Sequence, residues 1–213
     1  MKKIILTTCL ACVMAFSLAA CGGGSSSGAA ATSGSSSASS SSAASGSGQE
    51  QAAVAGEEYD VGDFTIFAPS GWMVVPQRDM LADADENGEY PISPDSIGLI
   101  KDGEDEWDAF SKPTIYVYKY EGDAAEQAET TAMFYDETED LELTINGKEC
   151  PAFEAKSAGL SDDDSFYVYD IVFIPVNDEV FFQANIPVDM IDFEGVNLDD
   201  ADVKAILESL KLK

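Results

Sequence analysis

The chain contains no histidine and few basic residues. Its 213 residues include 40 acidic and 11 basic side chains, a formal net charge of −29. Without histidine there is no Ser-His or Cys-His pair and no histidine general base. Residues 57–213 contain neither a Gly-x-Ser-x-Gly motif nor a phosphate-binding glycine loop. The electrostatic field of a chain with this negative charge repels nucleic acid and favours cationic partners. We therefore expect a protein that is not an enzyme and that binds no nucleic acid.

Cysteine is also scarce. Of the four cysteines, Cys9 and Cys12 precede Cys21, and Cys150 is alone in residues 57–213. That region therefore has no internal disulfide. Because no histidine is present to activate a thiolate, we expect Cys150 to be a small buried hydrophobic residue in a strand.

The N-terminus lacks an apolar run of comfortable membrane-spanning length. Lys2 and Lys3 precede an uncharged stretch, residues 4–20, which is marginal for crossing about 30 Å of hydrocarbon. The stretch ends in Leu18-Ala19-Ala20-Cys21, small residues followed directly by cysteine. This pattern resembles the lipobox of bacterial lipoproteins. The resemblance implies that residues 1–20 are a signal peptide, and that Cys21 carries lipid and anchors the chain to the extracytoplasmic face of the cell membrane.

Residues 22–56 have almost no apolar side chain larger than alanine. Such a segment cannot bury enough surface to offset the entropy of ordering. We expect residues 21–56 to form a lipidated cysteine and a disordered Gly/Ser/Ala-rich tether, with a reach of roughly 30–35 Å.

Residues 57–213 have the length and the hydrophobic pattern of one folded domain. Short β-like runs predict strands, and Asn177-Asp178 between two long ones predicts a hairpin turn. One helix is expected to begin near Asp123, and a second to occupy the C-terminal residues 198–213. The predicted strands lie at residues 64–69, 72–76, 114–120, 151–160, 165–176 and 179–188.

Two segments carry a further resemblance. "VGDFTIFAPSGW" at 61–72 and "ILESLKLK" at 206–213 look like the opening strand and closing helix of PsbP-like domains. The resemblance implies an α+β fold, an α/β/α sandwich around a mostly antiparallel sheet. It also implies a binding or assembly role rather than catalysis. Four positions match as fold residues: Phe64, Pro69, Gly71 and Trp72.

The segment "DADENGE" at 83–89 has two interpretations. Asp83, Asp85 and Asn87 occupy alternate positions, as in a calcium loop. An EF-hand is excluded, because its closing glutamate is replaced by Pro94 and prolines prevent the following helix. Either a looser calcium site or an Asn-Gly turn remains, and calcium is the one cofactor that the sequence suggests.

Aromatic residues raise two questions of placement. Trp107 and Phe110 lie in an acidic loop, where they either fold back onto the core or contact a protein or glycan partner. Tyr116, Tyr118 and Tyr120 alternate along one strand, and we expect them to pack in the core under a helix.

These features together predict a membrane-anchored, non-enzymatic lipoprotein that binds an unidentified protein or small ligand. One alternative is the solute-binding component of a transporter. Another is a wall-glycan hydrolase that uses a pair of carboxylates.

Overall fold

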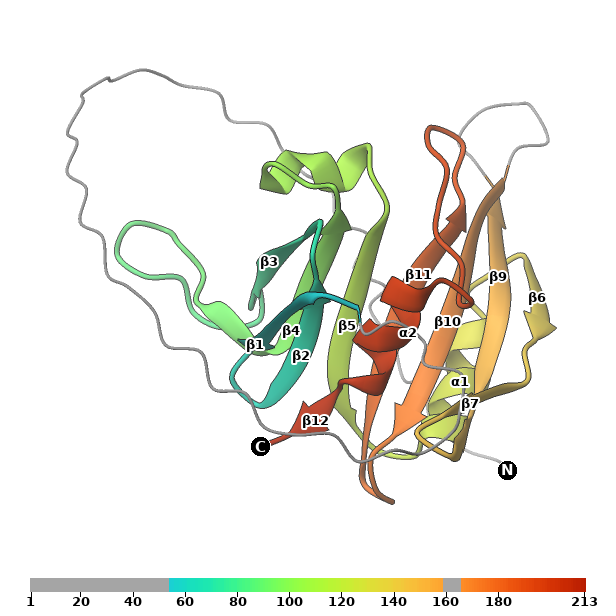
Figure 1. Cartoon of the computed structure of the whole chain (residues 1–213). Helices are drawn as coiled ribbons and strands as arrows, with labels where there is room; N and C mark the ends of the chain where they lie inside the picture. Colours follow the sequence, from blue (N-terminus) through green and yellow to red (C-terminus); the bar gives the residue numbers. More distant parts are fainter. Residues whose placement is uncertain (1–53, 159–165) are drawn as a thin grey trace, which may run out of the picture. The chain divides into compact units, whose positions relative to one another are not determined.

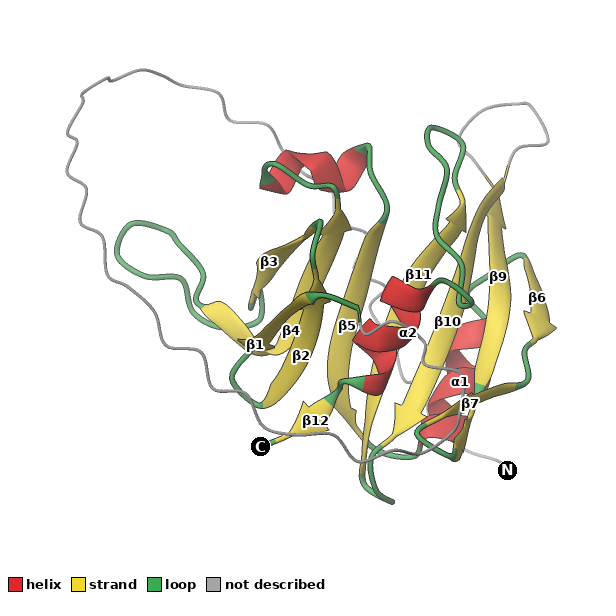
Figure 2. Ribbon diagram, in the orientation of Figure 1, coloured by secondary structure: helices red, strands yellow, loops and turns green. Residues whose placement is uncertain are grey.

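The computed structural model describes residues 54–158 and 166–213 (Figure 1). The predicted signal peptide, Cys21 and nearly all of the predicted tether lie outside these residues. The described part is a domain of antiparallel strands with helices on both faces of a sheet (Figure 2). This agrees with the predicted α+β class and its mostly antiparallel sheet.

The described residues contain twelve strands, two α-helices and one 3-10 helix. The helices are α1 (Ala124–Ala132), α2 (Ala201–Glu208) and the 3-10 helix η1 (Glu106–Phe110). The strands are β1 (Gly56–Asp60), β2 (Phe64–Pro69), β3 (Trp72–Arg78), β4 (Ile92–Lys101), β5 (Thr114–Glu121), β6 (Glu137–Asp140), β7 (Leu143–Ile145), β8 (Lys148–Cys150), β9 (Ala152–Ala158), β10 (Phe166–Pro175), β11 (Val180–Asp189) and β12 (Lys211–Leu212).

The main sheet has the strand order β3-β4-β5-β11-β10-β9-β6, and its neighbours are antiparallel. Its centre is the hairpin of β10 and β11, the two strands predicted to flank Asn177-Asp178. The Asn177 side chain closes this turn, since its Oδ1 accepts hydrogen bonds from the backbone N–H groups of Glu179 and Val180, both at 2.9 Å. The predicted hairpin is confirmed.

Each face of the main sheet packs against a different layer. On one face lie α2 and a small sheet of order β1-β2-β12, over a core that includes Phe64, Val172 and Ile206. On the other face α1 buries Ala124 and Ala128 against β9, β10 and β11. Figure 1 shows α2 in front of the sheet and α1 behind it. Because both faces are covered, β10 is apolar at successive positions, as its sequence predicted.

The first helix begins as predicted, whereas the second begins three residues later and ends earlier than expected. Asp123 caps α1 by accepting from the backbone N–H groups of Ala125 and Glu126, each at 2.9 Å. The expected helix over 198–213 is limited to α2, and residues 211–212 form β12 beside β2. Ser209 fixes this ending, because its hydroxyl donates to the Ile206 carbonyl and accepts from the Phe67 N–H.

The helices in residues 54–158 and 166–213 are all too short or too polar to cross a bilayer.

Candidate functional site

A ladder of tyrosines covers part of the sheet face that bears α1. Tyr116, Tyr118 and Tyr120 on β5 stack with ring centroids 6.5 and 6.1 Å apart. The helix α1 packs mainly on β9 and β10, and neither buried core includes these rings. The expectation that the three tyrosines lie in the core under a helix is therefore wrong. The helix is only nine residues long, so on this face of the wide sheet it covers mainly β9 and β10 rather than β5.

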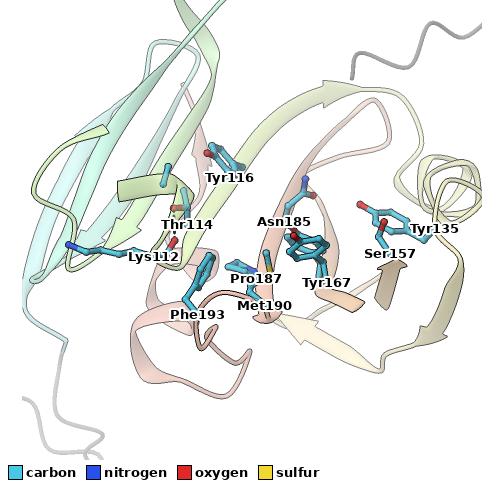
Figure 3. Close-up of a pocket in the computed structure, with 12 residues that line it drawn as sticks. Lys112, Thr114, Tyr116, Tyr135, Ser157, Tyr167, Asn185, Pro187, Met190 and Phe193 are labelled. Carbon is cyan, nitrogen blue, oxygen red and sulfur yellow. Dashed lines mark hydrogen bonds between the residues drawn. The ribbon is translucent and has the colours of Figure 1, made fainter. Parts of the chain in front are cut away.

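A cavity of about 360 Å³ adjoins this ladder. We call it the tyrosine cavity, because four of the described residues that line it are tyrosines: Tyr116, Tyr135, Tyr167 and Tyr169. The remainder of the lining is mostly apolar or neutral, and Figure 3 shows these side chains gathered around the hollow.

Strand register places the polar lining on one face. In the ladders of the main sheet, Tyr116 lies opposite Asn185, Pro187 opposite Tyr169, and Tyr167 opposite Ser157. Directly opposed residues in antiparallel strands point to the same face, and so do residues two apart on one strand. These three pairs therefore form one continuous row across β5, β11, β10 and β9.

Several polar groups in the cavity have unused hydrogen-bonding capacity. Asn185 Oδ1 accepts from Gln183 Nε2 at 2.9 Å, which leaves the Nδ2 protons of Asn185 available. The four phenol hydroxyls make no hydrogen bond to any residue that the structure describes. Burial raises the pKa of Tyr116, Tyr135 and Tyr169, and nearby phenols add to this effect at Tyr169. The hydroxyls of Tyr116, Tyr135 and Tyr169 are therefore neutral at physiological pH, and a phenol hydroxyl can both donate and accept.

Lys112 is the charged residue of the described lining, and its charge is neutralised locally. Its Nζ lies 2.9 Å from Asp108 Oδ2 and 2.7 Å from the Asp102 carbonyl. Asp108 raises the pKa of Lys112. The pKa of Asp108 is lowered by its hydrogen bond from the Glu104 N–H and then by Lys112. The described lining of the tyrosine cavity therefore carries no unpaired charge, within a strongly acidic protein.

The predicted partner residues Trp107 and Phe110 are exposed and do not fold back onto the core. They lie in η1, 67% and 62% exposed, with their rings stacked at a centroid distance of 6.1 Å. Asp105 fixes the start of η1 by accepting from the Trp107 N–H at 2.9 Å. Ala109 of the same short helix lines the tyrosine cavity, so the pair lies close to its rim.

The predicted calcium residues lie in a loop that Asp85 closes by itself. One carboxylate oxygen of Asp85 accepts from the backbone N–H groups of Asn87 and Glu89, both at 2.8 Å. Asn87 turns its amide nitrogen, not its oxygen, toward Asp85. Gly88 has φ of +81°, as expected in an Asn-Gly turn. Among the residues described, no three acidic or cysteine side chains gather as metal ligands. Calcium binding at Asp83, Asp85 and Asn87 stays a prediction.

The other singled-out residues have structural positions. Cys150 is 5% exposed at the end of β8, as predicted, and burial raises the pKa of its thiol. Phe64 and Trp72 are buried in the core beneath α2. The indole Nε1–H of Trp72 reaches Asp202 Oδ2 at 3.3 Å, which links β3 to α2.

Sequence reasoning missed most of the tyrosine cavity, including Tyr135, Ser157, Tyr167, Tyr169 and Asn185. Tyr135 lies at the end of the segment predicted as the first helix, and the other four lie in segments predicted as strands. The four strand residues become neighbours only through strand pairing. The available signal was tyrosine at alternate positions, 116, 118 and 120 on one strand and 167 and 169 on another.

Comparisons with known proteins assign no family, since neither a protein-family model nor a curated protein matches the chain.

Proposed function

We propose that the chain is a lipid-anchored protein of the extracytoplasmic membrane face that binds a small ligand in the tyrosine cavity. The N-terminal pattern Leu18-Ala19-Ala20-Cys21 supports the anchor. The cavity supports the binding role and is the observation on which it rests. Aromatic surfaces and convergent, unused polar groups on rigid strands are typical of ligand sites.

The folded domain is, in this proposal, PsbP-like. Three features support it: the opening strand Phe64–Pro69 with Gly71-Trp72 after it, the antiparallel main sheet, and helices on both sheet faces. Domains of that superfamily mostly bind or assemble with other molecules, which agrees with a binding module.

The lining of the cavity favours binding over hydrolysis of wall glycans. Glycoside hydrolysis uses two carboxyl groups placed on either side of the scissile bond. The described lining contains no Asp or Glu and no cysteine. The tyrosine cavity thus offers a ligand contacts but no acid–base pair.

A second candidate function is solute capture for a transporter. The exposed pair Trp107 and Phe110, joined to the cavity through Ala109, supports it, because a capture protein needs a surface for its membrane partner. In that case Trp107→Ala would abolish crosslinking to a permease without changing ligand affinity.

The proposed function is tested by ligand-induced thermal shifts. Full-length protein, purified from membranes in detergent, is screened against a metabolite panel and calcium. A ligand at a hundred times its dissociation constant stabilises the fold by about 2.7 kcal/mol. We expect at least one compound to raise the melting temperature of the wild type but not of Ser157→Trp, whose indole fills part of the cavity.

The matched control is Thr144→Trp, an exposed position on β7 outside the cavity, which should retain the full shift. Equal shifts in the wild type and Ser157→Trp for every active compound, or no active compound at all, would count against the tyrosine cavity as the site. A calcium shift that Asp85→Asn removes would instead establish the 83–89 loop as a metal site.

A further inference from the structure

The charge of the tyrosine cavity restricts its ligand, and this inference rests on the proposed function. Although 40 residues of the chain are acidic, none of the described residues that line the cavity is. Lys112 is held by Asp108 and the Asp102 carbonyl. A charged ligand would lose hydration there without finding a free opposite charge, which is costly. The cavity therefore suits a neutral molecule.

The unused polar groups restrict the ligand further. The hydroxyls of Tyr167, Tyr169 and Ser157 can each donate and accept, and Asn185 Nδ2 can donate. A neutral molecule that uses them must itself carry several donors and acceptors. An extended peptide cannot join the sheet at this place, because β5, β11, β10 and β9 already pair with one another. A proline-rich segment would offer mainly carbonyl acceptors.

The remaining lining is apolar. Met190 and Phe193 lie close to Pro187, the apolar member of the row on the sheet (Figure 3). A pyranose ring matches this division, because its edge carries hydroxyls and its faces carry C–H groups that pack on aromatic rings. At about 360 Å³ the cavity is at the small end of ligand pockets, which span roughly 300–1,000 Å³. That volume suits one or two sugar rings.

We propose that the tyrosine cavity binds a neutral saccharide of one or two rings. A C–H face of the sugar packs against the aromatic and apolar side chains. Its hydroxyls form hydrogen bonds with the phenols of Tyr167 and Tyr169 and with the amide of Asn185.

The test is isothermal titration of full-length protein in detergent with matched sugars. The panel contains glucose, galactose, N-acetylglucosamine and their disaccharides, beside glucuronate and glucosamine as charged analogues of similar shape. We expect at least one neutral sugar to bind and its charged analogues to bind at least tenfold more weakly, because the cavity offers no free counter-charge. Charged analogues that bind as tightly as the neutral sugar would overturn the inference.

Two variants locate the binding. Tyr169→Phe removes one hydroxyl and keeps the ring, and Asn185→Ala removes the amide donor. Each should lower the affinity for the neutral sugar about fivefold to tenfold, the range expected for the loss of one hydrogen bond of about 1 kcal/mol. Tyr90→Phe, which lies outside the cavity lining, is the matched control and should leave the affinity unchanged. Unchanged affinity in Tyr169→Phe and Asn185→Ala would contradict the assignment.

The outcomes separate this inference from the proposed function. If no saccharide binds, but a proline-rich peptide or another compound binds the wild type and not Ser157→Trp, the saccharide inference fails and the binding function stands. If no ligand of any class depends on position 157, both fail.

Discussion

At the scale of single residues, Asp170 is the most unfavourably placed carboxyl that the structure describes. It is 7% exposed on β10 and makes no hydrogen bond to a described residue. Burial, and then the neighbouring Glu154, raise its pKa to about 6. Glu154 lies directly opposite on β9, and Lys156 approaches Glu154 at 3.9 Å rather than Asp170. At neutral pH this carboxylate therefore destabilises the fold.

The sign of its pH dependence follows from linkage. Because the folded-state pKa is above the unfolded value of 3.8, the folded state binds the proton more tightly. The contribution of Asp170 to stability is fully present below about pH 4 and is lost as the pH rises through 6. A shift of this size corresponds to about 3 kcal/mol at most.

We expect Asp170→Asn to raise the free energy of unfolding at pH 7.5 by roughly 1–3 kcal/mol, because the variant buries no charge. The gain should shrink toward zero at pH 4, where the wild-type carboxyl is protonated in the fold. Urea denaturation at the two pH values measures this. The exposed Asp178→Asn should change stability by less than about 0.5 kcal/mol at both. A gain for Asp170→Asn that is the same at pH 4 and 7.5 would refute the explanation.

At the scale of elements, the two α-helices begin differently although each follows an aspartate. Asp123 caps α1 with two hydrogen bonds to backbone N–H groups. Asp200 precedes α2 without a side-chain capping bond, and its carboxylate accepts instead from the Asn197 N–H at 3.1 Å. The helix α1 therefore depends on its cap more than α2 does.

We expect Asp123→Ala to lower the free energy of unfolding by about 1 kcal/mol, the usual cost of losing an N-cap. Asp123→Ser should retain most of the wild-type free energy of unfolding, because the serine hydroxyl also accepts from the N–H groups of the first turn. Asp200→Ala should cost clearly less than Asp123→Ala. Guanidinium denaturation of the three variants measures the differences, and an equal or larger loss in Asp200→Ala would show that α1 does not depend on its cap.

Both α-helices and six of the twelve described strands were predicted, because their signals are local, whereas β1, β4, β6, β7, β8 and β12 were not. The apolar runs of β2, β5, β10 and β11, the turn at Asn177 and the cap at Asp123 each depend on neighbours in the sequence. β4 escaped prediction, since Pro94 and Gly98 are typical of loops. The sheet accommodates this stretch through an irregular register between Pro76 and Arg78 of β3, so Pro94 has no partner in the ladder. No local pattern could indicate that compensation.

At the scale of the whole molecule, the candidate site was less predictable than the fold. Trp107 and Phe110 stand out in the sequence because aromatic residues in an acidic loop are conspicuous. The tyrosine cavity combines β5, β9, β10, β11 and the segment after α1, and strand pairing places β5 of the first half of the domain beside β11 of the second. The pairing of Lys112 with Asp108 likewise could not be read from the sequence, because it depends on how the chain folds at the end of η1.

The proposed anchor gives the last prediction. We expect Cys21→Ala to abolish incorporation of an alkyne-labelled fatty acid and to leave the chain about 20 residues longer on gels, because in the proposal residues 1–20 are removed and the lipidated Cys21 becomes the first residue. Metabolic labelling followed by membrane fractionation measures both. Cys150→Ala is the control and should be labelled like the wild type. Labelling of Cys21→Ala at the wild-type level would refute the proposal that Cys21 carries the lipid anchor.

The small sheet has a mechanical consequence for a tethered protein. β2 is its central strand, and it pairs with β1 at the N-terminal end of the domain and with β12 at the C-terminal end. A pull through an N-terminal tether would reach the domain at Gly56, whose partner is Pro69 at the open end of the β1–β2 hairpin. The load would peel β1 away one pair at a time, while α2 and β12 keep β2 in place. Five residues released in this way add about 17 Å of slack. Under load β1 would therefore detach first, and the main sheet with the tyrosine cavity would stay folded.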